Sequence, residues 1–243
     1  MFVALIAICA TLGILATVNL FTIQGGYAAS QKEYAELRQY APLEMTAAIT
    51  ATALPNPGEE TAAIPAPSAE QEILPDLSAI NPDYIGWIRI EGTEIDYPVV
   101  QGKDNKEYLN ITFSGERNAS GTIFMDNRCA DGFRGFAILY GHNMKDGFMF
   151  AGLNRYLESG YPEEYPEIIV ITLDGKPLNF RIFDVKVTNI RDAAYALPDK
   201  EKADIGEYFT GQGMHEETGI LILSTCTDNR NENERLLVFA EKQ

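Results

Sequence analysis

One cysteine stands where a nucleophile could reach solvent. Cys226 ends the apolar run "LILSTC" (221–226), the polar stretch 227–234 follows, and the chain resumes as "RLLVFA" (235–240). A side chain at the end of a strand tends to face a rim rather than a core. Free cysteine is also commonly a small buried hydrophobe, so its position alone leaves both interpretations of Cys226 open.

A thiol needs a partner to become a thiolate near neutral pH, and a nearby imidazole is the usual one. The chain has two histidines, His142 in "YGHN" and His215 in "GMHEE". His142 directly follows the strand-like segment "FAILYG", whose glycine permits a tight exit. Because the ends of different strands can meet at one rim, we predict that His142 pairs with Cys226.

Arg235 begins the segment that follows the polar loop. If 219–225 and 235–240 are antiparallel neighbours, Arg235 lies beside Cys226 at the base of that loop. Its guanidinium could then donate fixed hydrogen bonds to a carbonyl oxygen that gains negative charge. Arg230, within the loop, is a less anchored rival, and a solvated charge is the alternative role for Arg235.

The remaining cysteines suggest no disulfide framework. Cys129 lies in "DNRCADGF" and Cys9 in an apolar N-terminal run, which makes three cysteines in all. A bridge between Cys129 and Cys226 stays open as an alternative. No cysteine or histidine spacing of the zinc type occurs, so we expect no metal site and no cofactor.

The elements that must position these side chains are mostly short β-segments. They are β-branched or aromatic and are bounded by Gly, Pro, Asn or Asp, a pattern that favours a β-barrel or sandwich. The predicted strands are 84–90, 95–100, 121–126, 136–141, 167–173, 178–190, 219–226 and 235–240. Helical patches are expected at about 71–80, at 149–157 and at 198–209, the last in a long crossover before the cysteine strand.

The N-terminal part predicts a membrane anchor and a spacer. Phe2 to Ile23 carries no charge and is long enough to cross about 30 Å of hydrocarbon. A cleavable signal peptide ending near "YAAS" is the rival, and the positive-inside rule gives no support for a cytoplasmic N-terminus. We expect an anchor over 1–24, a helical stalk and flexible linker over 25–71, and a catalytic domain over 72–243.

The charge balance excludes one class of partner. Lys and Arg total 19 against 35 Asp and Glu, a formal net charge of -16. A protein that tracks nucleic-acid phosphates is therefore not expected.

Three blocks of this sequence resemble the sortase family. "ILYGHNMKDGFMFAGLNRY" and "LSTCTDNRNENERLLVFA" are similar to its histidine and cysteine–arginine blocks. "INPDYIGWIRIEGTEIDYPVVQGKDNKEYLN" resembles the opening of the class B members. One departure is Ile222, where the family often has threonine. The resemblance covers about 72–243 and implies an eight-stranded sortase β-barrel with N-terminal helices and a helix in the crossover.

The resemblance also implies a reaction. Cys226 would cleave a C-terminal sorting signal of the LPXTG or NPXTX type on a surface protein, as a cysteine peptidase and transpeptidase, through a thioacyl intermediate. His142 would shuttle the proton and Arg235 would stabilise the oxyanion or position the signal. The acceptor would be an amine of a peptidoglycan cross-bridge or of lipid II, and the enzyme would be a single-pass membrane protein with an extracellular catalytic domain.

Five further residues correspond to substrate contacts of the family. They are Asn105, Leu109, Ser224, Thr225 and Tyr195. Leu109 as plain core and Ser224 and Thr225 as plain strand residues remain alternatives. Two other functions also stay open: a pilin-polymerising sortase, and an inactive peptide-binding module that uses the same groove.

Overall fold

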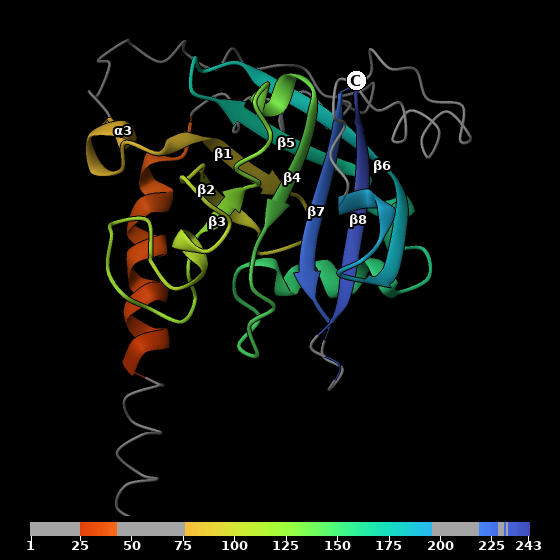
Figure 1. The fold of residues 1–243 in the computed structure, drawn as a ribbon, viewed down its shortest axis with the longest axis horizontal. Coiled ribbons are helices and arrows are strands. Elements are labelled where there is room, and N and C mark those ends of the chain that lie inside the picture. The colour runs from red at the N-terminus through yellow and green to blue at the C-terminus, as the bar shows by residue number, and fades with distance from the viewer. Residues whose placement is uncertain (1–24, 43–75, 196–218, 228–230, 232) are drawn as a thin grey trace, which may run out of the picture.

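The computed structural model describes residues 25–42, 76–195, 219–227, 231 and 233–243, and its eight strands close into one barrel (Figure 1). Around the barrel the order is β1-β2-β3-β4-β7-β8-β6-β5. The strands are β1 (Tyr84–Ile90), β2 (Asp96–Val100), β3 (Ile123–Met125), β4 (Phe136–Tyr140), β5 (Glu167–Thr172), β6 (Pro177–Asn189), β7 (Ile220–Cys226) and β8 (Glu234–Lys242). The predicted eight-stranded barrel is confirmed, and each strand overlaps a predicted segment.

Two of the strand pairs are parallel, and one of them brings distant parts of the chain together. β2 pairs with β3, and β4 pairs with β7, in parallel, whereas the other neighbours are antiparallel. Residues of β4 pair in order with residues of β7, from Phe136 with Ile220 to Tyr140 with Ser224. The carboxyl ends of β4 and β7 therefore lie at the same rim of the barrel.

β7 is buried on both faces, because its side chains alternate between two apolar layers. Leu221 and Leu223 belong to the main core inside the barrel. Ile220 and Ile222 point outward into a second cluster, which also contains Ala194 from the crossover. Of the β7 residues only Cys226, at the end of the strand, is exposed.

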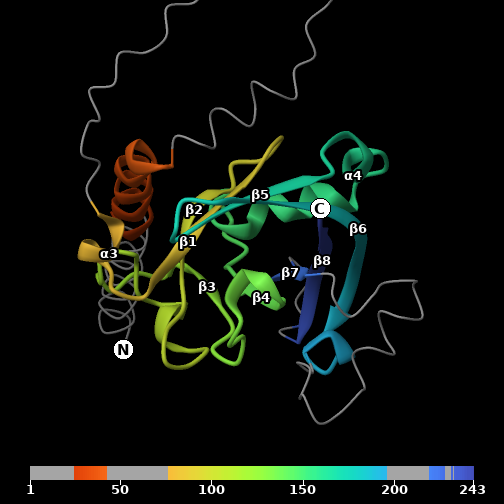
Figure 2. The same ribbon diagram turned by 90° about the horizontal axis from the view of Figure 1, so that it is seen from above.

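The segment that precedes the barrel is helical over 25–37 and continues as η1 (Arg38–Tyr40). Figures 1 and 2 both show it beside β1, β2 and β3, on the side of the barrel away from β8. Tyr34 and Leu37 are 1% and 4% exposed and belong to the main core. The helical spacing of Tyr34, Leu37 and Tyr40 therefore marks a helix that packs on the barrel, within the range 25–71 predicted as a helical stalk and linker.

The other helical segments are short. They are α3 (Leu77–Ile80), η2 (Glu107–Leu109), η3 (Gly132–Arg134), η4 (Phe150–Leu157), α4 (Tyr161–Glu164) and η5 (Ala193–Tyr195). The predicted helical patch at 149–157 is the 3-10 helix η4, and the patch at 71–80 contains α3. The predicted helix at 198–209 lies outside the described residues.

No helix within the part of the chain that the structure describes is long and apolar enough to span a membrane. The predicted anchor, 1–24, lies outside that part, as do residues 43–75, which include most of the predicted stalk and linker, 25–71. The anchor and the bounds of the three predicted segments therefore stay predictions.

We expect Gly121→Ala to lower the free energy of unfolding by about 3 kcal/mol, against about 1 kcal/mol for Gly115→Ala. Both glycines have left-handed backbone, with φ of 59° and 88°, so both substitutions share that strain. A Cβ at Gly121 would also lie 2.5 Å from the Tyr108 carbonyl oxygen, whereas nothing lies within 4 Å of one at Gly115. Urea unfolding of both variants measures the difference, and equal losses would contradict it.

Candidate active site

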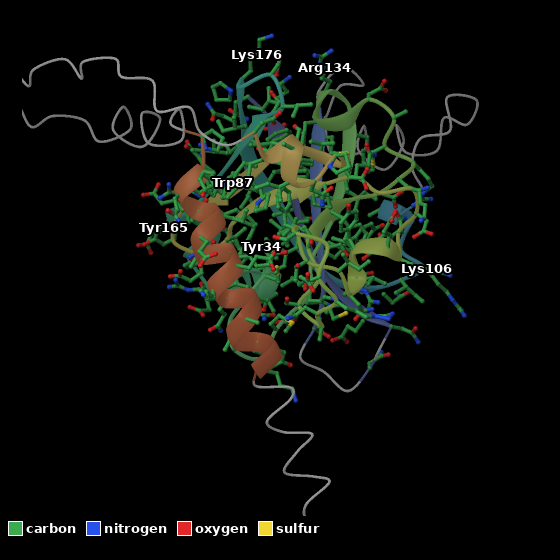
Figure 3. The ribbon with its side chains drawn as sticks, turned by 90° about the vertical axis from the view of Figure 1, so that its left-hand side faces the viewer. Tyr34, Trp87, Lys106, Arg134, Tyr165 and Lys176 are labelled. Carbon is green, nitrogen blue, oxygen red and sulfur yellow. The ribbon has the colours of Figure 1, made fainter. Side chains whose placement is uncertain are left out.

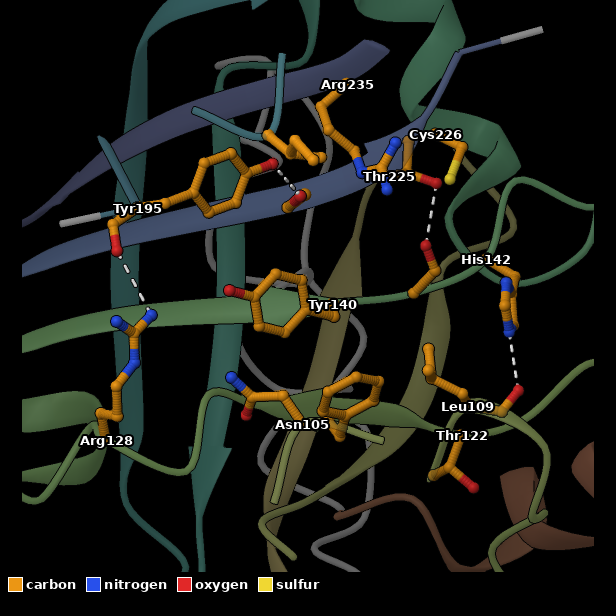
Figure 4. Close-up of a pocket in the computed structure, with 14 residues that line it drawn as sticks. Asn105, Leu109, Thr122, Arg128, Tyr140, His142, Tyr195, Thr225, Cys226 and Arg235 are labelled. Atoms are coloured by element: carbon orange, nitrogen blue, oxygen red, sulfur yellow. Dashed lines mark hydrogen bonds between the residues drawn. The ribbon is translucent and has the colours of Figure 1, made fainter. Parts of the chain in front are cut away.

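A cavity of about 400 Å³ opens on the outer face of β4, β7 and β8, at the rim where β4 and β7 end (Figure 4). The loop that contains η2, the start of β3 and the segment at η5 supply its other walls. The eight residues predicted to act in catalysis or substrate contact all line this cavity: Asn105, Leu109, His142, Tyr195, Ser224, Thr225, Cys226 and Arg235.

The parallel pairing of β4 with β7 brings His142 to Cys226. The ladder ends at the pair of Tyr140 with Ser224, and His142 and Cys226 each lie two residues beyond it. Because side chains alternate along a strand, Cys226 lies on the same outer face as Ser224. Tyr140 and His142 line the cavity with them.

β8 adds the third side chain of this row. Cys226 pairs directly with Arg235 in the antiparallel ladder of β7 and β8. Leu237, two residues further along β8, belongs to the same outer cluster as Ile222. His142, Cys226 and Arg235 therefore form one row across three adjacent strands, at the edge of an apolar layer.

Hydrogen bonds tie the histidine segment to the cysteine strand beyond the last ladder pair. The Thr225 hydroxyl donates to the Gly141 carbonyl oxygen at 2.8 Å. The side-chain amide of Asn143 donates to the Cys226 carbonyl oxygen at 2.9 Å, and its oxygen accepts from Asn154 at 3.0 Å. These bonds fix the backbones on either side of the thiol and the imidazole. Asn143 and Asn154 were not singled out from the sequence.

The backbone of Leu109 fixes the tautomer of His142. Nε2 of the ring lies 2.7 Å from the Leu109 carbonyl oxygen (Figure 4). A carbonyl oxygen only accepts, so Nε2 carries the proton. Nδ1 of the neutral ring is then the nitrogen with a lone pair, and in Figure 4 it is on the edge of the ring nearer Cys226. Leu109 thus acts on the site through its backbone as well as its side chain.

The two described cysteines are free and have opposite environments. Cys226 is exposed, whereas Cys129 is 3% exposed in the main core. Burial raises the pKa of the Cys129 thiol to about 11. The alternative of a bridge between Cys129 and Cys226 is therefore wrong, and of these two thiols Cys226 is the accessible one.

Arg235 is half-buried at the start of β8, and its guanidinium lies beside the end of β7 in Figure 4. Its Nη1 donates to the carbonyl oxygen of Glu234 at 2.8 Å. The Glu234 carboxylate in turn accepts from the Thr227 hydroxyl at 2.6 Å. Arg235 therefore lies beside Cys226 at the base of the loop, and its role toward an oxyanion stays a prediction. The rival, Arg230, lies outside the described residues.

Tyr195 closes the cavity away from the thiol. Its hydroxyl lies 2.7 Å from the Ser224 hydroxyl, and its ring stacks on Tyr140 with centroids 6.4 Å apart. Burial raises the pKa of Tyr195, so its hydroxyl stays protonated at neutral pH. Ser224 is 2% exposed, and its hydroxyl is engaged with Tyr195. Ser224 therefore shapes the wall of the cavity and holds Tyr195 in place.

An ion pair that the sequence did not predict supports the same end of the cavity. Asp126, which is fully buried, accepts from Arg128 at 2.9 and 2.7 Å and from the Tyr140 hydroxyl at 2.9 Å. Burial alone would raise the pKa of Asp126, but these hydrogen bonds outweigh it and lower that pKa. Arg128 also donates to the Tyr195 carbonyl oxygen at 3.2 Å. The spacing of Asp126 and Arg128 in the sequence "DNR" does not indicate this role.

Asn105 and Leu109 line the cavity from the loop that contains η2. The Asn105 side-chain oxygen accepts from the Asn127 amide at 2.8 Å, which holds two loops together. Leu109 is partly buried and packs against the main core. Leu109 therefore packs on the core and also lines the cavity, and its contact with a substrate stays a prediction.

Comparison with known proteins is consistent with this geometry. A family model described as a sortase domain matches residues 88–243. Sortase B of Listeria monocytogenes is 32% identical over 178 residues, which cover 68% of this chain and 72% of that protein. Sortase B of Staphylococcus aureus is also 32% identical, over 180 residues and the same shares.

Solved structures show the same similarity. Clostridium perfringens sortase B is 33% identical with a TM-score of 0.62, over 69% of this chain and 97% of that one. A Staphylococcus aureus sortase B–substrate complex is 26% identical with a TM-score of 0.67, over 89% of this chain and 97% of that one.

We expect a thiol reagent at pH 8 to modify Cys226 rapidly and Cys129 only after unfolding. With a pKa of about 11, only about one Cys129 thiol in a thousand is ionised at pH 8, and burial blocks access to it. A Cys9→Ser background removes the third thiol, and mass spectrometry of the labelled peptides identifies the site. Rapid labelling that persists after Cys226→Ala would contradict this assignment.

Proposed function

The chain belongs to the sortase family, in its class B, and from this premise we propose that this transpeptidase attaches surface proteins to the cell wall. Its donor would be a C-terminal sorting signal of the LPXTG or NPXTX type. Its acceptor would be an amine of a peptidoglycan cross-bridge or of lipid II. The observation that carries the proposal is the row of His142, Cys226 and Arg235 at the rim of one cavity.

In the first half-reaction the Cys226 thiolate attacks the carbonyl carbon of the scissile peptide bond. A carbon–sulfur bond forms, the carbon–nitrogen bond breaks, and protonated His142 gives its proton to the leaving amine. In the second half the acceptor amine attacks the thioester and loses a proton to His142. The new amide leaves, and the Cys226 thiolate is restored.

The hydrogen bond from His142 to Leu109 supports Nδ1 as the nitrogen that moves the proton, because Nε2 is already committed as a donor. Arg235 would donate to the oxygen that gains charge in each tetrahedral intermediate. The hydrogen bond from its guanidinium to the Glu234 carbonyl oxygen and its pairing with Cys226 in the β7–β8 ladder support that role.

We assign the recognition of the signal to Asn105, Leu109, Ser224, Thr225 and Tyr195. The hydroxyls of Ser224 and Thr225 are engaged with Tyr195 and Gly141, which supports a role in shaping the wall rather than in hydrogen bonding to the signal. Phe124, Tyr140 and Ile190 add apolar lining that suits the aliphatic or prolyl side chains of such a signal.

The location of the enzyme is also a proposal. Phe2 to Ile23 would anchor the chain as a single-pass membrane protein, with the barrel outside the cell. In that arrangement the barrel would meet its substrates where surface proteins leave the membrane and where cell-wall precursors are exposed.

A pilus-building role is the second candidate, and one similar structure favours it. A Streptococcus pyogenes class B sortase described as involved in pilus biogenesis is 29% identical with a TM-score of 0.61, over 69% of this chain and 96% of that one. The two functions differ in the acceptor, which is a lysine of another pilin in polymerisation. The complete row of three residues speaks against the third possibility, an inactive peptide-binding module.

We expect Cys226→Ala to abolish cleavage of a sorting peptide and leave the fold intact, because the thiol is the proposed nucleophile and alanine fits an exposed strand end. The assay incubates full-length chain with a library of sorting peptides and amine acceptors, with product masses as the readout. Cys129→Ala is the matched control and should keep activity. Cleavage by the Cys226→Ala variant would refute the mechanism.

We expect Arg235→Lys to lower kcat about 100-fold, or about 3 kcal/mol of transition-state stabilisation, with little change in KM or Tm. Lysine keeps the charge but lacks the planar, paired donors of arginine. Arg181→Lys, at an exposed position of β6 outside the cavity, is the control, and Arg230→Lys tests the rival in the loop. A wild-type kcat in Arg235→Lys would contradict this role and would assign the stabilisation of the oxyanion to backbone amides.

A further inference from the structure

The hydroxyl of Tyr34 is buried at the junction between the N-terminal helix and the barrel. Tyr34 is 1% exposed and lies on the helical segment 25–37 that covers this side of the barrel (Figure 3). Its hydroxyl donates to the Gly121 carbonyl oxygen at 2.7 Å, with the Thr122 hydroxyl oxygen at 3.1 Å as a second acceptor. A buried tyrosine hydroxyl needs an acceptor, and here both acceptors belong to adjacent residues of the barrel, Gly121 and Thr122.

Both partners of Tyr34 hold the segment that carries the Leu109 carbonyl. The Thr122 hydroxyl donates to the Ile111 carbonyl oxygen at 2.7 Å, and its amide donates to the Tyr108 carbonyl oxygen at 3.1 Å. Gly121 lies so close that a Cβ there would be 2.8 Å from the Leu109 carbonyl oxygen. Residues 121–122 are thus in direct contact with residues 108–111 at several points.

This segment in turn orients the histidine, because the Leu109 carbonyl oxygen accepts from His142 Nε2 at 2.7 Å. The path from Tyr34 to the ring therefore consists of three hydrogen-bonded steps: Tyr34 to residues 121–122, Thr122 to the carbonyls on either side of Leu109, and Leu109 to His142. Thr122 lies on the wall of the cavity, and Tyr34 lies behind it.

Tyr34 also touches the chain that follows His142. Its ring centroid is 5.7 Å from that of Phe148 and 5.5 Å from that of Tyr97. The loop holding Phe148 returns directly beneath the histidine, since the Phe150 amide donates to the His142 carbonyl oxygen at 2.9 Å. One side chain of the helix therefore supports both the backbone of His142 and the acceptor of its ring.

We propose that Tyr34 is a positioning residue for His142, so that the helix 25–37 supports the catalytic residues through this side chain. Its hydroxyl holds the Leu109 carbonyl in place through residues 121–122, and this keeps the proton on Nε2 and the lone pair on Nδ1. The expected effect of Tyr34 on kcat rests on the proposed function, whereas its expected effect on the tautomer of the His142 ring does not.

The test compares Tyr34→Phe with Tyr40→Phe in the full-length chain. Tyr40 is on the same segment, partly buried, and its hydroxyl donates no hydrogen bond to any residue that the structure describes. The readout is the ¹⁵N and ¹H spectrum of the two histidine rings, assigned with His142→Asn. We expect wild type and Tyr40→Phe to show His142 protonated at Nε2, and Tyr34→Phe to show a mixture of tautomers.

Kinetics on a sorting peptide supply the second arm. We expect kcat of Tyr34→Phe to fall about tenfold with KM within about twofold, since correctly placed proton transfer is worth 10²–10⁴-fold and only part of it is lost. Thr122→Val should repeat both effects, and Thr122→Ser, which keeps the hydroxyl, should restore them. If Tyr34→Phe fails to fold, the comparison of Thr122→Val with Thr122→Ser still tests whether this path positions His142.

An unchanged His142 spectrum in Tyr34→Phe and Thr122→Val would overturn the proposal, even if Tm falls, because Tyr34 would then only stabilise the fold. A changed spectrum with wild-type kcat would overturn it as well. If the wild-type chain cleaves no sorting peptide, the proposed function fails, and the spectra alone decide whether Tyr34 positions the ring.

Discussion

The site depends on the parallel pairing of β4 with β7. Parallel neighbours end at the same rim, so the residues that follow Tyr140 and Ser224 must lie together there. Register matters as much as direction. A slip of one residue along β7 would turn Cys226 and Ser224 inward and the apolar Leu223 outward. Because β7 is buried on both faces, such a slip would mismatch two apolar layers at once, and the packing of the strand protects the position of the thiol.

Much of this could be predicted from the sequence. The eight strands could be located because their β-branched and aromatic runs are bounded by turn residues, and Cys226, His142 and Arg235 stood out by rarity and by position at strand ends. The antiparallel pairing of β7 with β8 followed from a short loop. The parallel pairing of β4 with β7 could not be derived this way, because about a third of the chain separates the two strands and no local pattern specifies it.

The residues that support the site were harder to predict for the same reason. Arg128 and Tyr34 each bond a carbonyl oxygen, of Tyr195 and of Gly121, that only the closed barrel brings near them. Tyr34 gave a helical signal, but the pattern could not tell a stalk from a helix packed on the barrel, because both need an apolar stripe. Asn143 follows His142 directly, yet its partner, the carbonyl of Cys226, is a backbone atom without a sequence signature.

The two ends of the cavity are held by different parts of the fold. At the end with the thiol, strand ladders and the N-terminal helix fix the row of His142, Cys226 and Arg235. At the other end, Tyr195 is held by single side-chain bonds from Ser224 and Arg128, at the start of the crossover that leads to β7. Loop residues tolerate change better than ladder residues. We therefore infer that a substitution at Tyr195 can change which peptide is chosen without moving His142, Cys226 or Arg235. A substitution at Tyr34 in the helix would instead affect those three residues and leave the Tyr195 end of the cavity unchanged.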